Sequence, residues 1–220
     1  MFVENEQERV RVKICGLTTL NDARFVAGEG ADYMGFIFYE DSARYIKPAE
    51  AGAIINWVEG PECVGVFVNH PLDEVNRIAK QTGIDLIQLH GNESPEYCDL
   101  LDLPVIKTFH IDGDTDPADL KEEIEIYRDH IGYVLFDTKV ENAWGGTGRT
   151  FDWEVVRELS DEWDCFLSGG INTDNVQQAC ERVQPFAVDL ASGVEMKAGV
   201  KDYEEVEKFF NEIRQQQSPR

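Results

Sequence analysis

The sequence is poor in positive charge, has no long apolar run and has no pattern of paired cysteines. Lys and Arg number 20 against 43 Asp and Glu in 220 residues, which gives a formal net charge of −23. Nucleic acids and anionic membranes both select basic surfaces, so the sequence excludes a generic binder of either. No apolar stretch approaches the roughly 20 residues that a membrane-spanning helix requires.

The cysteines and the first residues indicate the compartment. The sequence contains five widely spaced cysteines: Cys15, Cys63, Cys98, Cys165 and Cys180. Their number is odd and no C-x-x-C occurs, so they predict neither a disulfide scaffold nor a zinc-finger site, and no metal is expected. Residues 1–8 include acidic groups where a secretory signal has basic residues and an apolar stretch. We therefore expect a soluble cytoplasmic protein with reduced thiols.

The acidic excess is spread along the chain, for example over 4–8, 112–125 and 161–164. Like charges repel one another in a compact protein unless salt screens them, and the screening length falls from about 10 Å at 0.1 M to about 3 Å at 1 M salt. The composition therefore predicts a halophilic protein, adapted to high intracellular salt. An ordinary acidic cytosolic protein is the alternative.

Eight short β-rich runs alternate with amphipathic segments. The predicted strands are 10–15, 33–38, 63–68, 85–90, 104–109, 132–137, 164–168 and 186–190. Helices are predicted at 49–57, 72–81, 118–129, 153–159, 175–183 and 203–213. Strand followed by helix, repeated in this way, predicts a single (β/α)8 TIM barrel of the α/β class. The alternative is an open doubly wound sheet, but its G-x-G-x-x-G fingerprint is missing after the first strand.

The barrel domain is expected over residues 10–214, with a polar N-terminal extension at 1–9 and a polar C-terminal tail at 215–220. In such barrels the chemistry lies at the carboxyl ends of the strands and in the loops after them. The predicted strands end in polar or reactive residues: Cys15, Asn69, His70, His90, Asp137, Ser168, Gly169, Gly170 and Asp189.

Two of these side chains are suited to acid–base chemistry. Alternation along the first strand places Lys13 and Cys15 on one face, so Cys15 should point to the barrel mouth, where the Lys13 ammonium would favour its thiolate. Asp137 ends the sixth strand at the rim of an apolar barrel, a position that can raise a carboxyl pKa and suit a general acid. By position alone, a buried inert cysteine and a loop-capping aspartate are equally open alternatives.

Anion-binding candidates follow other strands. Gly169–Gly170 after the seventh strand and Ser192–Gly193 after the eighth could bring backbone N–H groups to a phosphate, whereas ordinary turn glycines are the alternative. Arg44 follows the second strand and could bind a carboxylate in a bidentate manner, with a surface ion pair as the alternative.

Two further patterns resemble ligand-binding loops but do not fit them. Acidic residues between 112 and 123 occupy ligand places of an EF-hand loop, but Pro117 stands where that loop needs Gly. The glycine-rich segment 145–148 lacks the P-loop pattern. We interpret the first as a solvated acidic loop and the second as a mobile loop over the barrel mouth.

Taken together, the motifs of these segments resemble those of phosphoribosylanthranilate isomerases, enzymes of tryptophan biosynthesis. In family order they are VKICGLT (12–18), SARYI (42–46), VGVFVN (64–69), QLHG (88–91), DTK (137–139), GGTG (145–148), FDW (151–153), LSGG (167–170), FAVD (186–189) and SGVE (192–195). The resemblance extends over about residues 10–210. The sequence departs from the family in the extension at 1–9, in its acidity and at Ala191, where some members carry a second Ser.

The resemblance implies an Amadori rearrangement of N-(5-phosphoribosyl)anthranilate to 1-(2-carboxyphenylamino)-1-deoxyribulose 5-phosphate, without a metal or organic cofactor. It implies that Asp137 is the general acid that protonates the ribose ring oxygen. Cys15 is then the general base that removes the C2′ proton. A small-molecule substrate is the partner that this activity requires.

The resemblance also implies how the substrate is held. Arg44 would bind the anthranilate carboxylate, and the backbone around Gly169–Gly170 and Ser192–Gly193 would bind the phosphate. Asp189 would order that region, and His90 is assigned only as a contact at the rim. Because the substrate is doubly anionic and the protein acidic, the mouth is expected to be locally positive. The cations available for this are Lys13, Arg44 and Lys107.

Three alternatives remain open at this point. The histidine-pathway isomerase of the same fold works with two aspartates, and Cys15 is evidence against it. Indole-glycerol-phosphate synthase would need a catalytic Lys and Glu set that the sequence does not show. A non-catalytic barrel used for binding or assembly predicts no turnover and indifference to changes at Cys15 and Asp137. A monomer is expected, because there is no coiled-coil pattern or long apolar surface stripe.

Overall fold

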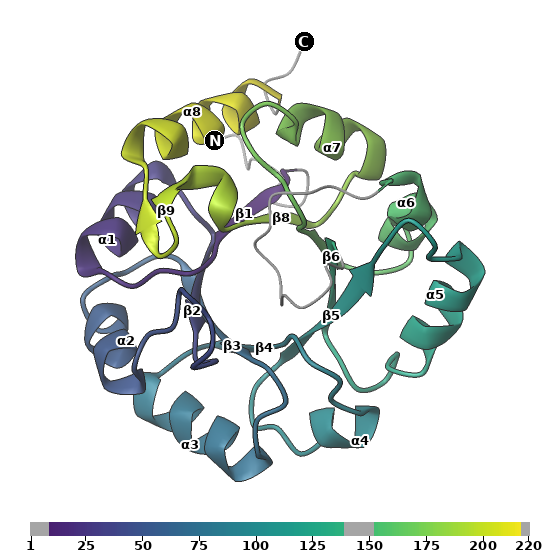
Figure 1. The fold of residues 1–220 in the computed structure, drawn as a ribbon, viewed down its shortest axis with the longest axis horizontal. Coiled ribbons are helices and arrows are strands. Elements are labelled where there is room, and N and C mark those ends of the chain that lie inside the picture. The colour runs from purple at the N-terminus through teal and green to yellow at the C-terminus, as the bar shows by residue number, and fades with distance from the viewer. Residues whose placement is uncertain (1–8, 139–151, 217–220) are drawn as a thin grey trace, which may run out of the picture.

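The computed structural model describes residues 9–138 and 152–216, and within them eight parallel strands form a closed barrel. Each strand pairs with the next along the chain, and β8 pairs with β1 to close the ring (Figure 1). The strands are β1 (Arg11–Ile14), β2 (Tyr33–Ile37), β3 (Glu62–Phe67), β4 (Leu86–Leu89), β5 (Val105–Ile111), β6 (Tyr133–Thr138), β7 (Cys165–Leu167) and β8 (Ala187–Leu190). The predicted (β/α)8 barrel is confirmed.

Helices surround the barrel on the outside (Figure 1). They are α1 (Leu20–Glu29), α2 (Pro48–Ile55), α3 (Leu72–Thr82), α4 (Pro95–Cys98), α5 (Pro117–Glu125), α6 (Glu154–Ser160), α7 (Val176–Val183) and α8 (Tyr203–Gln216). The sequence did not predict α1 or α4, and α4 has only 4 residues, too few for a helical period to show. No helix in the described ranges is long and apolar enough to cross a membrane.

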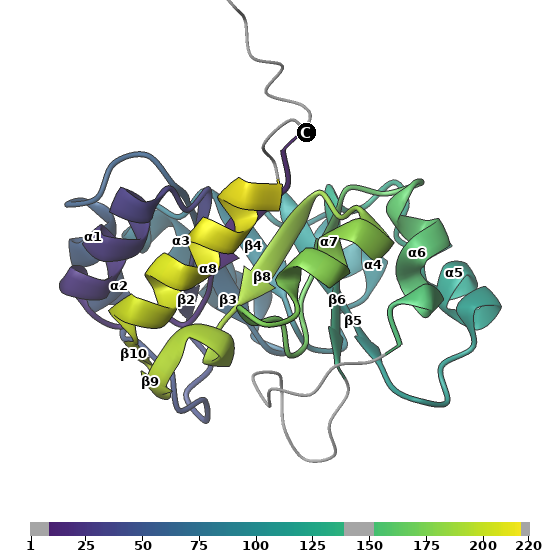
Figure 2. The ribbon, with the colours of Figure 1, turned by 90° about the horizontal axis from the view of Figure 1, so that it is seen from above.

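A short hairpin extends the chain beyond β8 and was not predicted. It follows the 3₁₀ helix η1 (Ser192–Val194) and consists of β9 (Glu195–Lys197) and β10 (Val200–Lys201), which pair antiparallel. Figure 2 shows this hairpin at the edge of the molecule toward which β8 runs. It therefore lies at the carboxyl ends of the strands, where barrels of this kind hold their sites.

Local sequence signals account for the helix ends. The Thr19 side chain accepts a hydrogen bond from the backbone N–H of Asp22 at the start of α1, and Gly30 ends that helix at a φ of 98°. Asp116 caps α5 in the same way, just before Pro117 in the first turn. The acidic segment that resembled a calcium loop thus contains a helix cap.

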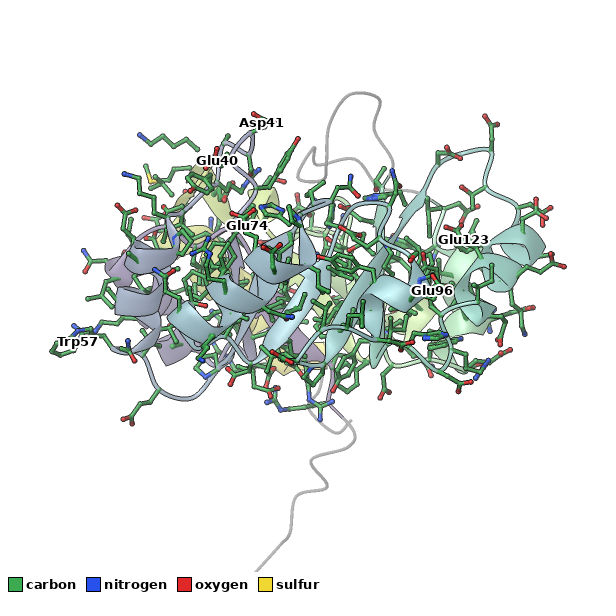
Figure 3. The ribbon with its side chains drawn as sticks, turned by 90° about the horizontal axis from the view of Figure 1, so that it is seen from below. Glu40, Asp41, Trp57, Glu74, Glu96 and Glu123 are labelled. Atoms are coloured by element: carbon green, nitrogen blue, oxygen red, sulfur yellow. The ribbon has the colours of Figure 1, made fainter. Side chains whose placement is uncertain are left out.

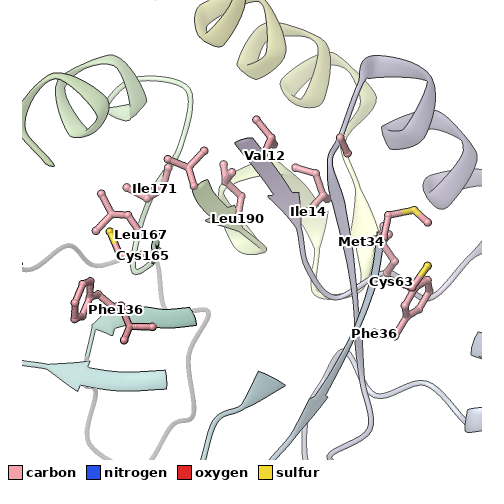
Figure 4. Close-up of a cluster of buried hydrophobic side chains, with 14 of the residues drawn as sticks. Val12, Ile14, Met34, Phe36, Cys63, Phe136, Cys165, Leu167, Ile171 and Leu190 are labelled. Atoms are coloured by element: carbon pink, nitrogen blue, oxygen red, sulfur yellow. The ribbon is translucent and has the colours of Figure 1, made fainter. Parts of the chain in front are cut away.

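Alternation along the strands separates two apolar layers. One layer fills the barrel interior with Tyr33, Val64, Leu86, Ile106, Leu135, Phe166 and Ala187. The other lies between strands and helices, and Figure 4 shows part of it, with Val12 and Ile14 of β1 near Leu190 of β8. Because the interior is filled by side chains, the barrel is a packed core and not a pore.

The cysteines behave as the sequence predicts. All five are free and buried. Burial raises the pKa of the thiols of Cys63, Cys165 and Cys180 to about 12 and that of Cys98 to about 11. These four therefore act as small apolar side chains.

The contribution of the interior layer to stability can be tested at Phe166. Its ring packs edge-on against Tyr33 and Tyr133 and contacts Phe186. Phe166→Ala removes a fully buried ring, so the free energy of unfolding should fall by about 3–5 kcal/mol in chemical denaturation at fixed salt. The control Leu100→Ala, at a side chain that is 60% exposed, should change it by less than about 0.5 kcal/mol. Equal effects would contradict the assignment.

Candidate active site

A pocket opens at the carboxyl ends of the strands and gathers polar side chains from around the barrel. It is lined by Cys15, Ile37, Tyr39, Ser42, Arg44, Val66, Val68, Gln88, His90, Asp137, Ser168, Asp189 and Ala191. The predicted site residues Cys15, Arg44, His90, Asp137 and Asp189 therefore share one pocket. These five residues are far apart in the sequence. They meet because the parallel strands all end at the same face of the barrel.

Cys15 lies directly after β1, next to Lys13. The Lys13 side chain is fully buried, and its Nζ donates a hydrogen bond of 2.9 Å to Oδ1 of Asp189, the residue opposite it on β8. Burial lowers the pKa of Lys13, but the Asp189 carboxylate and the Cys15 sulfur outweigh this and raise it, so the ammonium persists.

The Cys15 thiol has two opposing neighbours. Burial raises its pKa, the Lys13 ammonium lowers it, and the Asp189 carboxylate raises it, with a net increase. Lys13 therefore favours the thiolate, as the sequence predicted, but burial is the larger effect.

Lys201 of β10 is a buried cation at the site that the sequence analysis missed. Its Nζ donates to the carbonyl oxygens of Cys15 at 2.6 Å and Ala191 at 3.2 Å, and to Oε1 of Glu195 at 3.0 Å. It thereby ties the β9–β10 hairpin to the end of β1. No local pattern marks Lys201, because its partners lie elsewhere in the chain.

Arg44 holds a carboxylate of the protein itself. Its Nε lies 3.0 Å from both carboxylate oxygens of Glu195, and its Nη2 lies 2.7 Å from Oε2. The alternative of an ion pair is therefore realised, although the pair is largely buried rather than on the surface. A guanidinium has five N–H donors, so this pair leaves Arg44 able to bind a further anion in the pocket.

Asp137 and His90 are neighbours near the floor of the pocket. Oδ1 of Asp137 accepts a hydrogen bond of 2.8 Å from the backbone N–H of Thr138, and Oδ2 lies 3.5 Å from Nε2 of His90. The other ring nitrogen of His90 contacts Gln88 Nε2 and Thr108 Oγ1, both at 3.1 Å. The residue assigned to the rim is thus a buried neighbour of the candidate acid.

The glycines after β7 and β8 are required by close packing. A Cβ on Gly169 would lie 2.3 Å from Thr138 Oγ1, and one on Gly193 would lie 2.2 Å from the carbonyl oxygen of Ile171. Gly169 and Gly170 both have a φ of 77°, a conformation that favours glycine. The two loops, including Ser192 in η1, therefore lie against neighbouring backbone, and their glycines have a structural role whatever they bind.

The expectation that the mouth of the barrel is locally positive needs correction, because the three cations named for it are paired with carboxylates. Lys13 is paired with Asp189 and Arg44 with Glu195, while Lys107 lies 3.2 Å from a carboxylate oxygen of Glu93. Each of the three cations is thus matched by a buried carboxylate, because an unpaired buried charge is costly. These residues do not by themselves make the mouth positive.

Some predictions lie outside the described residues. They concern the loop at 145–148, the ends of the DTK and FDW motifs at 139 and 151, and most of the two polar ends, at 1–8 and 217–220.

Comparisons with known proteins agree on one family. Residues 12–212 match the family described as "N-(5′phosphoribosyl)anthranilate (PRA) isomerase". The N-(5′-phosphoribosyl)anthranilate isomerase of Geobacter sp. (strain M21) is 44% identical over 207 residues, which cover 93% of this chain and 98% of that protein. That of Thermotoga neapolitana is 44% identical over 209 residues, covering 93% and 98%.

Solved structures lead to the same family. The crystal structure of phosphoribosyl anthranilate isomerase from Thermotoga maritima superposes with a TM-score of 0.85 at 37% identity and covers 94% of this chain and 99% of its own. A family member in complex with reduced 1-(o-carboxyphenylamino)-1-deoxyribulose 5-phosphate superposes with a TM-score of 0.82 at 36% identity, with the same coverage. From its motifs, its fold and these relatives, the chain belongs to the N-(5′-phosphoribosyl)anthranilate isomerase family.

Proposed function

We propose that this chain catalyses the Amadori rearrangement of N-(5′-phosphoribosyl)anthranilate to 1-(2-carboxyphenylamino)-1-deoxyribulose 5-phosphate in tryptophan biosynthesis. The observation that carries the proposal is the single pocket lined by Cys15, Arg44 and Asp137. A thiol, a carboxyl group and a guanidinium are the base, the acid and the carboxylate binder that this reaction requires. The relative solved with a reduced form of the product supports the same substrate class.

In the proposed mechanism Asp137 donates its proton to the ribose ring oxygen. The C1′–O bond breaks and the anthranilate nitrogen supplies its lone pair, which gives an iminium ion. Cys15, as the thiolate, then removes the C2′ proton. The electron pair of that C–H bond neutralises the iminium and forms an enolamine, which tautomerises to the ketone. Lys13 stabilises the thiolate during this step, because its nearby ammonium lowers the pKa of the Cys15 thiol.

Substrate binding is assigned to the rest of the site. Arg44 offers its remaining N–H donors to the anthranilate carboxylate, and backbone N–H groups around Gly169–Gly170 and Ser192–Gly193 hold the phosphate. Asp189 keeps Lys13 charged and in place. No metal or organic cofactor enters this scheme, since Asp137 supplies the proton for ring opening and Cys15 accepts the proton removed from C2′.

The acid and base assignments are tested by Cys15→Ser and Asp137→Asn. Each should lower kcat by about 10²–10⁴-fold, because it removes one proton-transfer group. Turnover is followed as the loss of anthranilate fluorescence of freshly generated substrate. The matched control Cys180→Ser, at a buried thiol on α7, should retain the wild-type kcat. Full activity in either site variant would refute its assigned role.

The Lys13–Cys15–Asp189 contact predicts opposite pH shifts in two variants. Lys13→Met removes the charge that stabilises the thiolate, so the midpoint of Cys15 alkylation by iodoacetamide should move up by about one pH unit or more. Asp189→Asn removes a charge that opposes the thiolate but keeps an Oδ1 that can accept from Lys13 Nζ and hold the ammonium in place, so the midpoint should move down. Mass spectrometry identifies the alkylated cysteine, and the exposed Lys208→Met is the control. Shifts in the same direction would contradict the proposed electrostatics.

We further propose that the enzyme is adapted to high salt. The net charge of −23 supports this, as does an acidic cluster of Glu40, Asp41 and Glu74, which line one surface hollow. Figure 3 shows these three side chains near one another. Raising KCl from dilute buffer to about 2 M should raise the thermal unfolding temperature and the isomerase rate, because screening weakens the repulsion. Highest stability and activity in dilute buffer would overturn this proposal.

A cytoplasmic monomer is the proposed state of the enzyme. Its five free cysteines suit a reducing compartment. Within residues 9–138 and 152–216 the exposed large apolar side chains are Trp57, Leu100, Ile126, Met196 and Tyr203, which belong to different parts of the helical ring and the β9–β10 hairpin. Such scattered side chains do not make the apolar patch of an obligate dimer. Light scattering in high KCl measures the mass directly.

A further inference from the structure

Two residues that line the pocket, His90 and Asp137, form with His110 a cluster of nitrogen and oxygen donors that the isomerase mechanism does not use as a unit. Three neighbouring strands contribute one residue each: His90 follows β4, His110 lies near the end of β5, and Asp137 lies in β6. His110 and Asp137 are register partners between β5 and β6. One potential ligand atom from each of the three residues lies within 4.8 Å of the other two.

We propose that His90, His110 and Asp137 bind a divalent transition-metal ion such as Zn²⁺, and that the bound ion reversibly inhibits the isomerase. Two imidazoles and one carboxylate are a donor set that Zn²⁺ and its neighbours in the first transition row prefer. Mg²⁺ and Ca²⁺ prefer oxygen ligands, so the site discriminates against them.

His90 gives an independent sign that a ligand belongs here. Its side chain is 9% exposed, and its buried Nε2 has no hydrogen-bond partner among the described residues. A buried polar atom without a partner is destabilising unless something else satisfies it. Its distance of 3.5 Å to Asp137 Oδ2 is close to the roughly 3.3 Å that separates two ligands on a tetrahedral zinc ion with bonds of about 2.0 Å.

The surroundings hold the donors in a suitable orientation. Gln88 and Thr108 contact Nδ1 of His90, so the opposite nitrogen faces Asp137. Nε2 of His110 lies 3.2 Å from the carbonyl oxygen of His90. Thr108 Oγ1 can accept from Nδ1 of His90 and the His90 carbonyl from Nε2 of His110, and acceptors of this kind orient metal-bound histidines. The two rings are nearly perpendicular, with centroids 4.9 Å apart.

The consequence for catalysis follows from the role of Asp137, and this part of the inference rests on the proposed function. An ion bound to Asp137 holds it as a carboxylate and removes the proton that the ring oxygen must receive. The ion also occupies part of the pocket that the substrate enters. Inhibition should therefore be relieved by a chelator and should compete with substrate.

Metal binding is tested first, without reference to activity. Isothermal titration with Zn²⁺ should give one site in the wild-type protein, and His110→Gln should weaken binding at least tenfold. The control His130→Gln, at a histidine outside the pocket that contacts Asp99, should bind as the wild type does. Because Cys15 shares the pocket, Cys15→Ser is titrated as well and should still bind. Equal binding by wild type and His110→Gln, or loss of binding in Cys15→Ser, would overturn the site.

Inhibition is tested with the same proteins. Zn²⁺ should abolish wild-type turnover and EDTA should restore it, whereas the turnover of His110→Gln should resist the same Zn²⁺ concentration. One-site binding together with uninhibited turnover would refute the inhibitory role. One-site binding in a folded protein that never turns over phosphoribosylanthranilate would instead refute the proposed function and leave the metal site in place.

Discussion

The rest of the site depends on the pairing of buried charges where the barrel closes. Lys13 of β1 and Asp189 of β8 lie opposite each other in the parallel ladder and form a buried ion pair. Next to them Glu195 binds both Arg44 and Lys201. A buried ammonium or guanidinium without its carboxylate would be strongly destabilising, so these residues hold one another in place. Lys201 donates a hydrogen bond to the carbonyl oxygen of Cys15, and the charges of Lys13 and Asp189 act on its thiol, so both groups shape the surroundings of this residue.

Inside the barrel, the polar side chains of the site and the apolar side chains of the core form two separate layers. Along β5, Ile106 belongs to the apolar interior cluster, whereas further along the strand Thr108 contacts His90 and His110 lies beside Asp137. The strand period of two residues and the common direction of all eight strands make this layering possible. The apolar layer beneath the pocket excludes water. The electrostatic interactions in the pocket are therefore screened less and are stronger.

Much of the fold and of the site was predictable from the sequence. The eight strands follow from short β-rich runs, and Cys15 and Asp137 follow from the rule that chemistry lies where barrel strands end. The short helix α4 and the β9–β10 hairpin were missed because neither is long enough to show a period. Lys201 was missed for a different reason, since a lone lysine late in the chain carries no local sign of a buried partner.

The sequence by itself determined the order of strands and helices, the family and the residues able to transfer protons. These depend on side-chain period and residue type, which are local properties of the chain. Only the tertiary structure decided which charges are paired, so that Arg44 binds Glu195 and Lys13 binds Asp189. It alone also brought His90, His110 and Asp137 together. Such contacts join residues far apart in the sequence, and their distances exist only once the barrel has closed.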